Sequence, residues 1–306
     1  MNRRDFLKKS SYAGISAYAY LSLGTNFIVA NSKTTQTDLY DLVAIKGGKP
    51  DSMFDTAIQS LGGMKNFVKK NQTVVIKPNI GWDTIPERAA NTNPKLIARI
   101  VKHCLDAGAK QVYVFDHTCD NWKSCYSNSG IEKAAKDSGA MVVPGNSESY
   151  YQHVDIPNGK NLKETTVHEL ILESDVLINV PVLKSHGGAG LTVSMKNLMG
   201  VVWDRRYWHR NDLHQCIADY ATFRKPDLNI VDAYAVMKKN GPRGVSEADL
   251  AILKSLIISA DIVAADAAAA KLFGSDPANI DYITYADKMK VGTMDLSKLK
   301  INRIIL

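Results

Sequence analysis

Short apolar runs alternate along the chain with longer segments of mixed polarity. The apolar runs are four to ten residues long and rich in valine and isoleucine, which is typical of strands buried on both faces. Most of them end in a polar residue and are followed by a loop. They cover residues 73–79, 111–117, 141–144, 175–184, 227–233, 255–261 and 300–306.

The segments between these runs have the spacing of amphipathic helices. In residues 93–108, Asn93 is set as the N-cap, Pro94 as the first helical residue and Gly108 as the stop, with apolar side chains along one face. Further helices are predicted over residues 129–140, 167–175, 212–223 and 261–274. Strands alternating with helices predict a mainly parallel sheet with helices on both faces, which is a three-layer α/β fold.

The first 32 residues read as a targeting segment and not as part of the fold. Arg3 and Arg4 stand before Phe6 and Leu7, and a modestly apolar stretch follows over residues 11–30. This resembles a twin-arginine (Tat) signal, with a cut expected after Ser32 and an uncleaved membrane anchor as the alternative. We expect the Tat machinery as a partner, a periplasmic or cell-envelope location, no stable membrane span after cleavage, and one domain over residues 33–306.

Charge and cysteine content remove two classes of function. The formal net charge is +7, but residues 1–32 carry +3 of it, and the rest has no block of like charges. Nucleic-acid binding is therefore not expected. The four cysteines contain no CxxC pair, so the spacing does not support an iron–sulfur cluster. Cys119 and Cys125 could form a disulfide, and Cys104 is expected to be buried on a helix face.

Polar residues gather where the predicted strands end. Ligands of parallel sheets bind outside the carboxyl ends of the strands, so these side chains are candidates for one site. An aspartate in such a place is often only a helix cap, but capping does not require lysine. The residues are Lys77 and Asn79, Asp116 and His117, Lys184 and His186, and Asp232.

The segment LKSHGGAGLTVSMKN, residues 183–197, has the parts of an anion-binding loop. Gly187, Gly188 and Gly190 would let the backbone approach a ligand, and a helix from about Thr192 would direct its amides at the loop. Lys184, Lys196 and Asn197 would add positive charge and hydrogen bonds. Neither the GxxxxGK[ST] loop nor the dinucleotide fingerprint GxGxxG is present, which disfavours ATP and NAD bound in those ways.

Three histidines make a metal ion the alternative ligand. His186, His209 and His214 lie close in the sequence, and a carboxylate from Asp116 or Asp232 could complete the site. We take His186, His214 and Asp116 as the candidate metal ligands. No GxSxG elbow is present, which argues against an ordinary serine hydrolase.

Several motifs in order resemble the DUF362 family, from about residue 40 to residue 295. They are KPNIGWD at 77–83, AANTNP at 89–94, the long motif at 183–205, Leu213-His214, KPDLNIVDA at 225–233 and NGPRG at 240–244. The resemblance implies a shared ligand site at residues that recur in the family, and it names no reaction. Family members often carry an added ferredoxin-like segment, which this chain lacks. The recurring residues are Lys77, Asn79, Asp116, Lys184, His186, Lys196, Asn197, His214 and Asp232.

These observations predict an exported enzyme that acts on a small anionic substrate, or on a bound cofactor or metal, with redox or isomerase chemistry favoured. We expect Lys184, Asp116, His186 and Asp232 to be catalytic. We expect the ligand to be bound by Lys77, Asn79, Gly187, Gly188, Gly190, Lys196 and Asn197. The cofactor is unknown, and the alternative is a non-catalytic periplasmic protein that binds an oxyanion, metal or cofactor.

Overall fold

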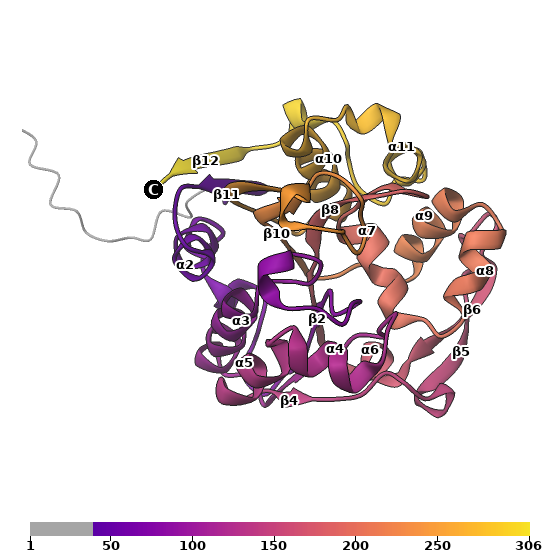
Figure 1. Cartoon of the computed structure of the whole chain (residues 1–306), viewed down its shortest axis with the longest axis horizontal. Coiled ribbons are helices and arrows are strands. Elements are labelled where there is room, and N and C mark those ends of the chain that lie inside the picture. The colour runs from indigo at the N-terminus through magenta and orange to yellow at the C-terminus, as the bar shows by residue number, and fades with distance from the viewer. Residues whose placement is uncertain (1–38) are drawn as a thin grey trace, which may run out of the picture. The chain divides into compact units, whose positions relative to one another are not determined.

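The computed structural model describes residues 39–306, so the expected signal segment lies outside the described residues. Within them, a ten-stranded sheet has the main strand order β12-β1-β11-β10-β7-β2-β3-β4, with β8 and β9 joined beside β10 (Figure 1). Its strands are β1 (Leu42–Lys46), β2 (Thr73–Pro78), β3 (Gln111–Val114), β4 (Met141–Val142), β7 (Val176–Val180), β8 (Val182–His186), β9 (Gly190–Thr192), β10 (Leu228–Met237), β11 (Leu250–Ser259) and β12 (Ile301–Ile305). A separate antiparallel pair is formed by β5 (Tyr151–Asp155) and β6 (Glu164–His168).

Parallel pairing dominates the ten-stranded sheet. Strand β2 is parallel to β3 and β7, β3 to β4, β10 to β7 and β8, and β1 to β12. The antiparallel pairs are β11 with β1 and β10, and β8 with β9. The predicted mainly parallel sheet is therefore confirmed.

Helices cover both faces of this sheet. They are α2 (Pro50–Ser60), α3 (Pro94–Ala107), α4 (Trp122–Asn128), α5 (Ile131–Asp137), α6 (Glu169–Glu173), α7 (Ser194–Asn197), α8 (Arg205–Arg210), α9 (Leu213–Phe223), α10 (Ile262–Phe273) and α11 (Asp281–Lys288). Alternate residues of a strand belong to different cores: Val74 and Ile76 pack with α2 and α3, whereas Val75 packs with α9 and α10. This alternation is the pattern of a sheet buried on both faces and confirms three layers.

The local signals in the sequence set the helix ends. The Asn93 side chain accepts a hydrogen bond from the Lys95 amide at the start of α3, and Gly108 ends the helix in the left-handed conformation at φ 101°. Asp212 caps α9, and Asp261 caps α10. One prediction needs correction: residues 167 and 168 finish strand β6, so the helix predicted from residue 167 begins only at Glu169.

The glycine-rich segment is a β-hairpin and not an open loop. A turn over residues 187–189 joins strand β8 to β9, and the two strands pair antiparallel with His186 opposite Gly190. The short helix α7 follows directly. In the described part of the chain, no helix is both long enough and apolar enough to span a membrane.

Candidate functional site

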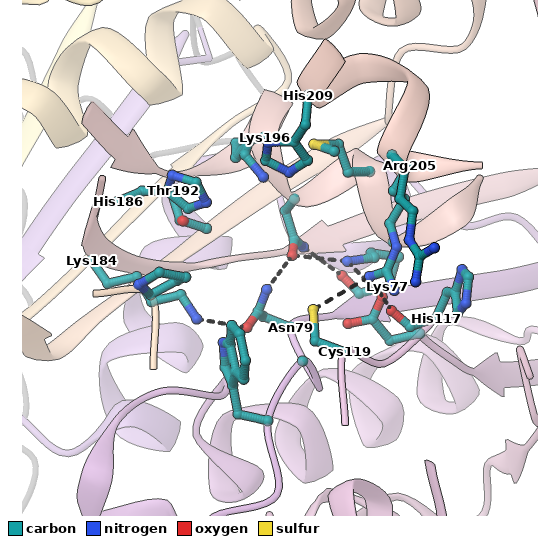
Figure 2. Close-up of a pocket in the computed structure, with 18 residues that line it drawn as sticks. Lys77, Asn79, His117, Cys119, Lys184, His186, Thr192, Lys196, Arg205 and His209 are labelled. Carbon is teal, nitrogen blue, oxygen red and sulfur yellow. Dashed lines mark hydrogen bonds and ion pairs between the residues drawn. The ribbon is translucent and has the colours of Figure 1, made fainter. Parts of the chain in front are cut away.

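A cavity of about 360 Å³ opens where β2, β3 and β8 end at the same edge of the sheet (Figure 2). Helices α7 and α8, strand β9 and the loops that follow β2 and β3 contribute most of the rest of its wall. The cavity is lined by Lys77, Asn79, Gly81, Trp82, Asp116, His117, Cys119, Lys184, His186, Thr192, Lys196, Asn197, Met199, Gly200, Arg205, Arg206, His209 and Pro242. Five of these residues are lysine or arginine, and Asp116 is the only carboxylate among them.

Lys77 and Asp116 form a buried ion pair at the floor of the cavity. The Lys77 Nζ atom lies 3.0 Å from Asp116 Oδ1, and Asp116 Oδ2 accepts a hydrogen bond of 2.7 Å from the Ile80 amide. Burial lowers the pKa of Lys77, and the neighbouring carboxylate opposes that shift. The single carboxylate is therefore already neutralised by Lys77, which leaves the other cations of the cavity without an anionic partner on its wall.

Gly200, which was not among the predicted site residues, makes room for this pair. A Cβ atom on residue 200 would lie 1.9 Å from Asp116 Oδ1 and 2.6 Å from Lys77 Nζ. No side chain larger than hydrogen fits there unless the pair moves.

Asn197 links the charged residues through its side-chain amide. Its Oδ1 atom accepts hydrogen bonds from Lys77 Nζ at 2.8 Å and Asn79 Nδ2 at 3.0 Å. Its Nδ2 group donates to Asn179 Oδ1 at 2.8 Å. The side-chain carbonyl of Asn79 in turn accepts a hydrogen bond from Lys184, so three strands and α7 are joined beneath the cavity.

Lys184 is buried to the same extent as Lys77, with 1% of its surface exposed. Its Nζ atom donates to Asn79 Oδ1 at 3.0 Å and to the Ala90 carbonyl, and no carboxylate among residues 39–306 pairs with it. Burial lowers the pKa of Lys184 to about 7, and the positive charge of Lys196 acts in the same direction. Lys184 can therefore exchange a proton near neutral pH.

Lys196 extends from α7 into the cavity and has no hydrogen-bond or ion-pair partner among residues 39–306. The side chain keeps some exposure. Burial lowers its pKa to about 8, and Arg205 and Lys77 contribute to the shift. An amine without a protein partner in a cationic cavity is suited to pair with an anionic ligand.

The start of α7 does not offer its amides to a ligand, contrary to the sequence-based expectation. The Asp266 carboxylate accepts hydrogen bonds from the Ser194 amide at 2.7 Å and the Met195 amide at 3.0 Å. Asp266 is fully buried on α10, and burial raises its pKa to about 7. A protein carboxylate thus occupies the place in which we expected a bound anion.

The glycines of the hairpin also differ from expectation, because Gly187, Gly188 and Gly190 do not line the cavity. The Gly188 and Ala189 amides donate to His186 Nδ1 at 3.1 and 3.0 Å. Since Nδ1 accepts these bonds, the ring proton of neutral His186 is on Nε2. Burial and the charge of Lys196 lower the pKa of His186 to about 3, so the ring is neutral at pH 7.

Helix α8 supplies three lining residues, of which only His209 was considered from the sequence, as a possible metal ligand. Arg205 donates to the carbonyls of His117 and Thr118 at 2.8 and 2.7 Å, which fixes the loop after β3. Arg206 and His209 also line the cavity, and the His209 ring lies 6.3 Å from that of His186 and nearly parallel to it. Arg205 ends the motif at 183–205, but neither Arg205 nor Arg206 follows a predicted strand, which was the signal that selected the other site residues.

Two predicted site residues lie outside the cavity. Asp232 accepts hydrogen bonds from the Asn93 amide at 2.8 Å and the Tyr234 amide at 3.1 Å, so it serves the start of α3. His214 Nδ1 accepts from the Tyr282 amide at 3.3 Å. Neither residue lines the cavity.

The candidate metal ligands His186, His214 and Asp116 are consequently not brought together. Within the described residues, one group of three possible ligands lies within 4.8 Å, and it consists of the exposed side chains His153, Asp155 and Glu164 on β5 and β6. The four cysteines are free, so Cys119 and Cys125 are not bonded here, and Cys104 is buried as expected.

Comparisons with known proteins identify a family. The family model described as "Domain of unknown function (DUF362)" matches residues 74–271. A thylakoid-associated protein of Synechocystis sp. is 26% identical over 242 residues, which cover 76% of this chain and 73% of that protein.

Two solved structures are similar to parts of this chain. The lactate racemase apoprotein of Thermoanaerobacterium thermosaccharolyticum is 12% identical with a TM-score of 0.48, over 75% of this chain and 56% of that one. A protein of Thermotoga maritima is 11% identical with a TM-score of 0.43, over 60% of this chain and 51% of that one. The chain thus spans little more than half the length of either structure.

Proposed function

Since the chain belongs to the DUF362 family, whose description names no activity, we propose a function from the cavity itself. The protein binds a small organic anion between β2, β8, α7 and α8 and catalyses proton transfer on it. The reaction is of the isomerase type, because it moves a proton and needs no net oxidation.

One observation carries this proposal: five lysine and arginine side chains line the cavity, and its one carboxylate is paired with Lys77. Burying amines without anionic partners is unfavourable, as the lowered pKa values of Lys184 and Lys196 indicate. A bound anion would remove that penalty. A volume of about 360 Å³ suits a small molecule.

The residues divide into two roles. Lys196 and Arg206 have no partners in residues 39–306 and would hold the carboxylate or phosphate of the ligand. Lys184 would accept the proton, since a pKa of about 7 leaves an appreciable neutral fraction at neutral pH. Its hydrogen bonds to Asn79 and Ala90 fix the direction of the amine.

The test is solvent exchange on a panel of small carboxylic acids. The protein in D₂O should catalyse loss of the NMR signal of a C–H next to a carboxylate in at least one panel member. Lys184→Met should abolish exchange while a bound acid is still detected by calorimetry. Lys102→Met, an exposed lysine on α3, is the matched control and should retain exchange.

Other outcomes decide against the proposal in different ways. Tight binding of an anion with no exchange by any acid would favour the non-catalytic binding protein. Absence of binding by every carboxylate and by phosphate would contradict the anion site itself.

Export is a separate part of the proposal and rests on Arg3 and Arg4 in MNRRDFLKK. We propose that the Tat route carries the folded protein to the periplasm or cell envelope and that cleavage follows Ser32. Mass spectrometry of the mature amino terminus tests the cut, and the double change Arg3→Lys and Arg4→Lys should block export. Export unaffected by that change would contradict the Tat route.

A further inference from the structure

Cys119 lies on the cavity wall in the loop that follows β3, and the proposed proton transfer does not use it. Its amide donates to the Gly81 carbonyl at 2.8 Å, and Arg205 binds the carbonyls of the two residues before it. Arg205 Nη1 also donates to the Cys119 sulfur at 3.5 Å. The thiol is therefore held in a fixed place beside a guanidinium group.

The other three cysteines are buried and are not accessible to a ligand. They are Cys104, Cys125 and Cys216, and burial raises the pKa of Cys125 and Cys216 to about 12. Cys119 is the exposed one. A thiol that is both accessible and close to positive charge is the kind that reacts as a thiolate.

Positively charged side chains from several elements share the cavity with the sulfur. Lys77 on β2, Lys184 on β8 and Lys196 on α7 line it together with Cys119. Arg205 faces it from α8. The Asp116 carboxylate, which would repel a thiolate, is paired with Lys77.

A second observation marks the same cavity as a place for a ligand. Thr192 lines it from β9 with only 4% of its surface exposed, and its hydroxyl has no hydrogen-bond partner in residues 39–306. A nearly buried hydroxyl left without a partner on a cavity wall fits a polar ligand group. Figure 2 shows Thr192, Lys196, Lys184 and Cys119 around one space.

We propose that Cys119 is the nucleophile of this cavity and that its substrate is a small carboxylate with an electrophilic carbonyl carbon, such as a 2-oxo acid. This rests on the proposed anion site. The Cys119 thiol gives its proton to solvent water, and the resulting thiolate adds to the carbonyl carbon and forms a C–S bond, while the π electrons of the C=O bond move to its oxygen. That oxygen takes a proton from the Lys196 ammonium, and nothing is oxidised or reduced.

Two alkylating reagents of nearly the same size test the inference. Iodoacetate and iodoacetamide both form a C–S bond and release iodide, but only iodoacetate is anionic. Iodoacetate should label Cys119 faster than iodoacetamide, by about tenfold or more, because the cationic cavity concentrates the anion. Peptide mass spectrometry should find one adduct, at Cys119, and Cys119→Ser should remove it.

The cationic wall supplies the matched control. Arg206→Gln should lower the iodoacetate rate and leave the iodoacetamide rate nearly unchanged, since the thiol and Arg205 are untouched. Pyruvate labelled with ¹³C at its carbonyl should show a new tetrahedral carbon signal with the wild type and none with Cys119→Ser.

The outcomes separate this inference from the proposed function. A Cys119 that reacts equally with both reagents, or no tetrahedral pyruvate carbon, would overturn the nucleophile, even where calorimetry still detects anion binding. Loss of anion binding together with equal labelling would overturn both.

Discussion

The amine of Lys77 lies 3.0 Å from the Asp116 carboxylate, and both side chains are almost fully buried. Buried ion pairs contribute little relative to apolar residues of the same shape, but loss of one partner leaves an uncompensated charge. The pair also holds Asn197, because Lys77 donates a hydrogen bond to Asn197 Oδ1. It therefore orders the floor of the cavity without adding net charge to it.

Asp116→Asn should destabilise the protein strongly, because the charge of Lys77 would then be buried without a partner. We expect the free energy of unfolding to fall by about 3–5 kcal/mol, as measured by urea denaturation. The double variant Lys77→Met with Asp116→Asn should regain part of that loss. A double variant less stable than Asp116→Asn would show that the unpaired charge is not the cause.

Gly200→Ala should disturb the ion pair of Lys77 and Asp116, because the added side chain would occupy the space of that pair. The added Cβ atom would lie 1.9 Å from Asp116 Oδ1, so the pair or the backbone must move, and overpacking of this kind costs about 1–3 kcal/mol. Gly187→Ala is the matched control, since a Cβ there meets nothing within 4 Å. Equal melting temperatures for the two variants would contradict the packing that we describe.

The pKa of Lys184 gives the stability a defined pH dependence. A lysine in the unfolded chain keeps its proton up to about pH 10.4, whereas folded Lys184 loses it near pH 7. Between these values the unfolded state binds more protons, so this lysine makes the free energy of unfolding rise with pH, by at most about 1.4 kcal/mol per pH unit.

Lys184→Met removes that contribution and is compared with the wild type in urea denaturation from pH 7 to pH 9.5. The stability of Lys184→Met relative to the wild type should be greatest at pH 7 and should decline as the pH rises. A difference that does not change with pH would mean that Lys184 has an ordinary pKa.

The sequence predicted the parts of the site that depend on strand direction. Carboxyl ends of parallel strands meet at one edge, so Lys77, Asp116 and Lys184 could be expected to lie near each other. It did not predict which face of the sheet a strand-end residue occupies. Asp232 is two residues after Ile230 on the same strand, so it lies on the face of the sheet that packs against α3. Its carboxylate there accepts a hydrogen bond from the Asn93 amide.

The remaining differences come from contacts between distant segments. The carboxylate that binds the start of α7 belongs to Asp266, 72 residues later in the chain, and no local pattern indicates that pairing. The glycine-rich segment satisfied the composition of an anion loop, but pairing of β8 with the three-residue strand β9 made it a hairpin. Arg205 and Arg206 enter the site from a six-residue helix, which is too short to have a clear period.

Asp266→Asn should weaken anion binding through α7, although Asp266 lies outside the cavity. Its carboxylate accepts from two backbone amides that precede Lys196 and Asn197, and an asparagine amide would replace one acceptor by a donor. The start of α7 should shift, and with it the Lys196 amine. We expect the affinity for a small carboxylate, measured by calorimetry, to fall about tenfold, which corresponds to about 1.4 kcal/mol.

Asp261→Asn is the control for that variant, because Asp261 accepts hydrogen bonds from the Val263, Ala264 and Thr293 amides and, within residues 39–306, none from α7. Both variants should lower the free energy of unfolding by about 1–3 kcal/mol, since each loses charge-assisted hydrogen bonds. Only Asp266→Asn should also lose affinity for the anion. Equal affinity in the two variants would show that Lys196 does not depend on Asp266 for its position.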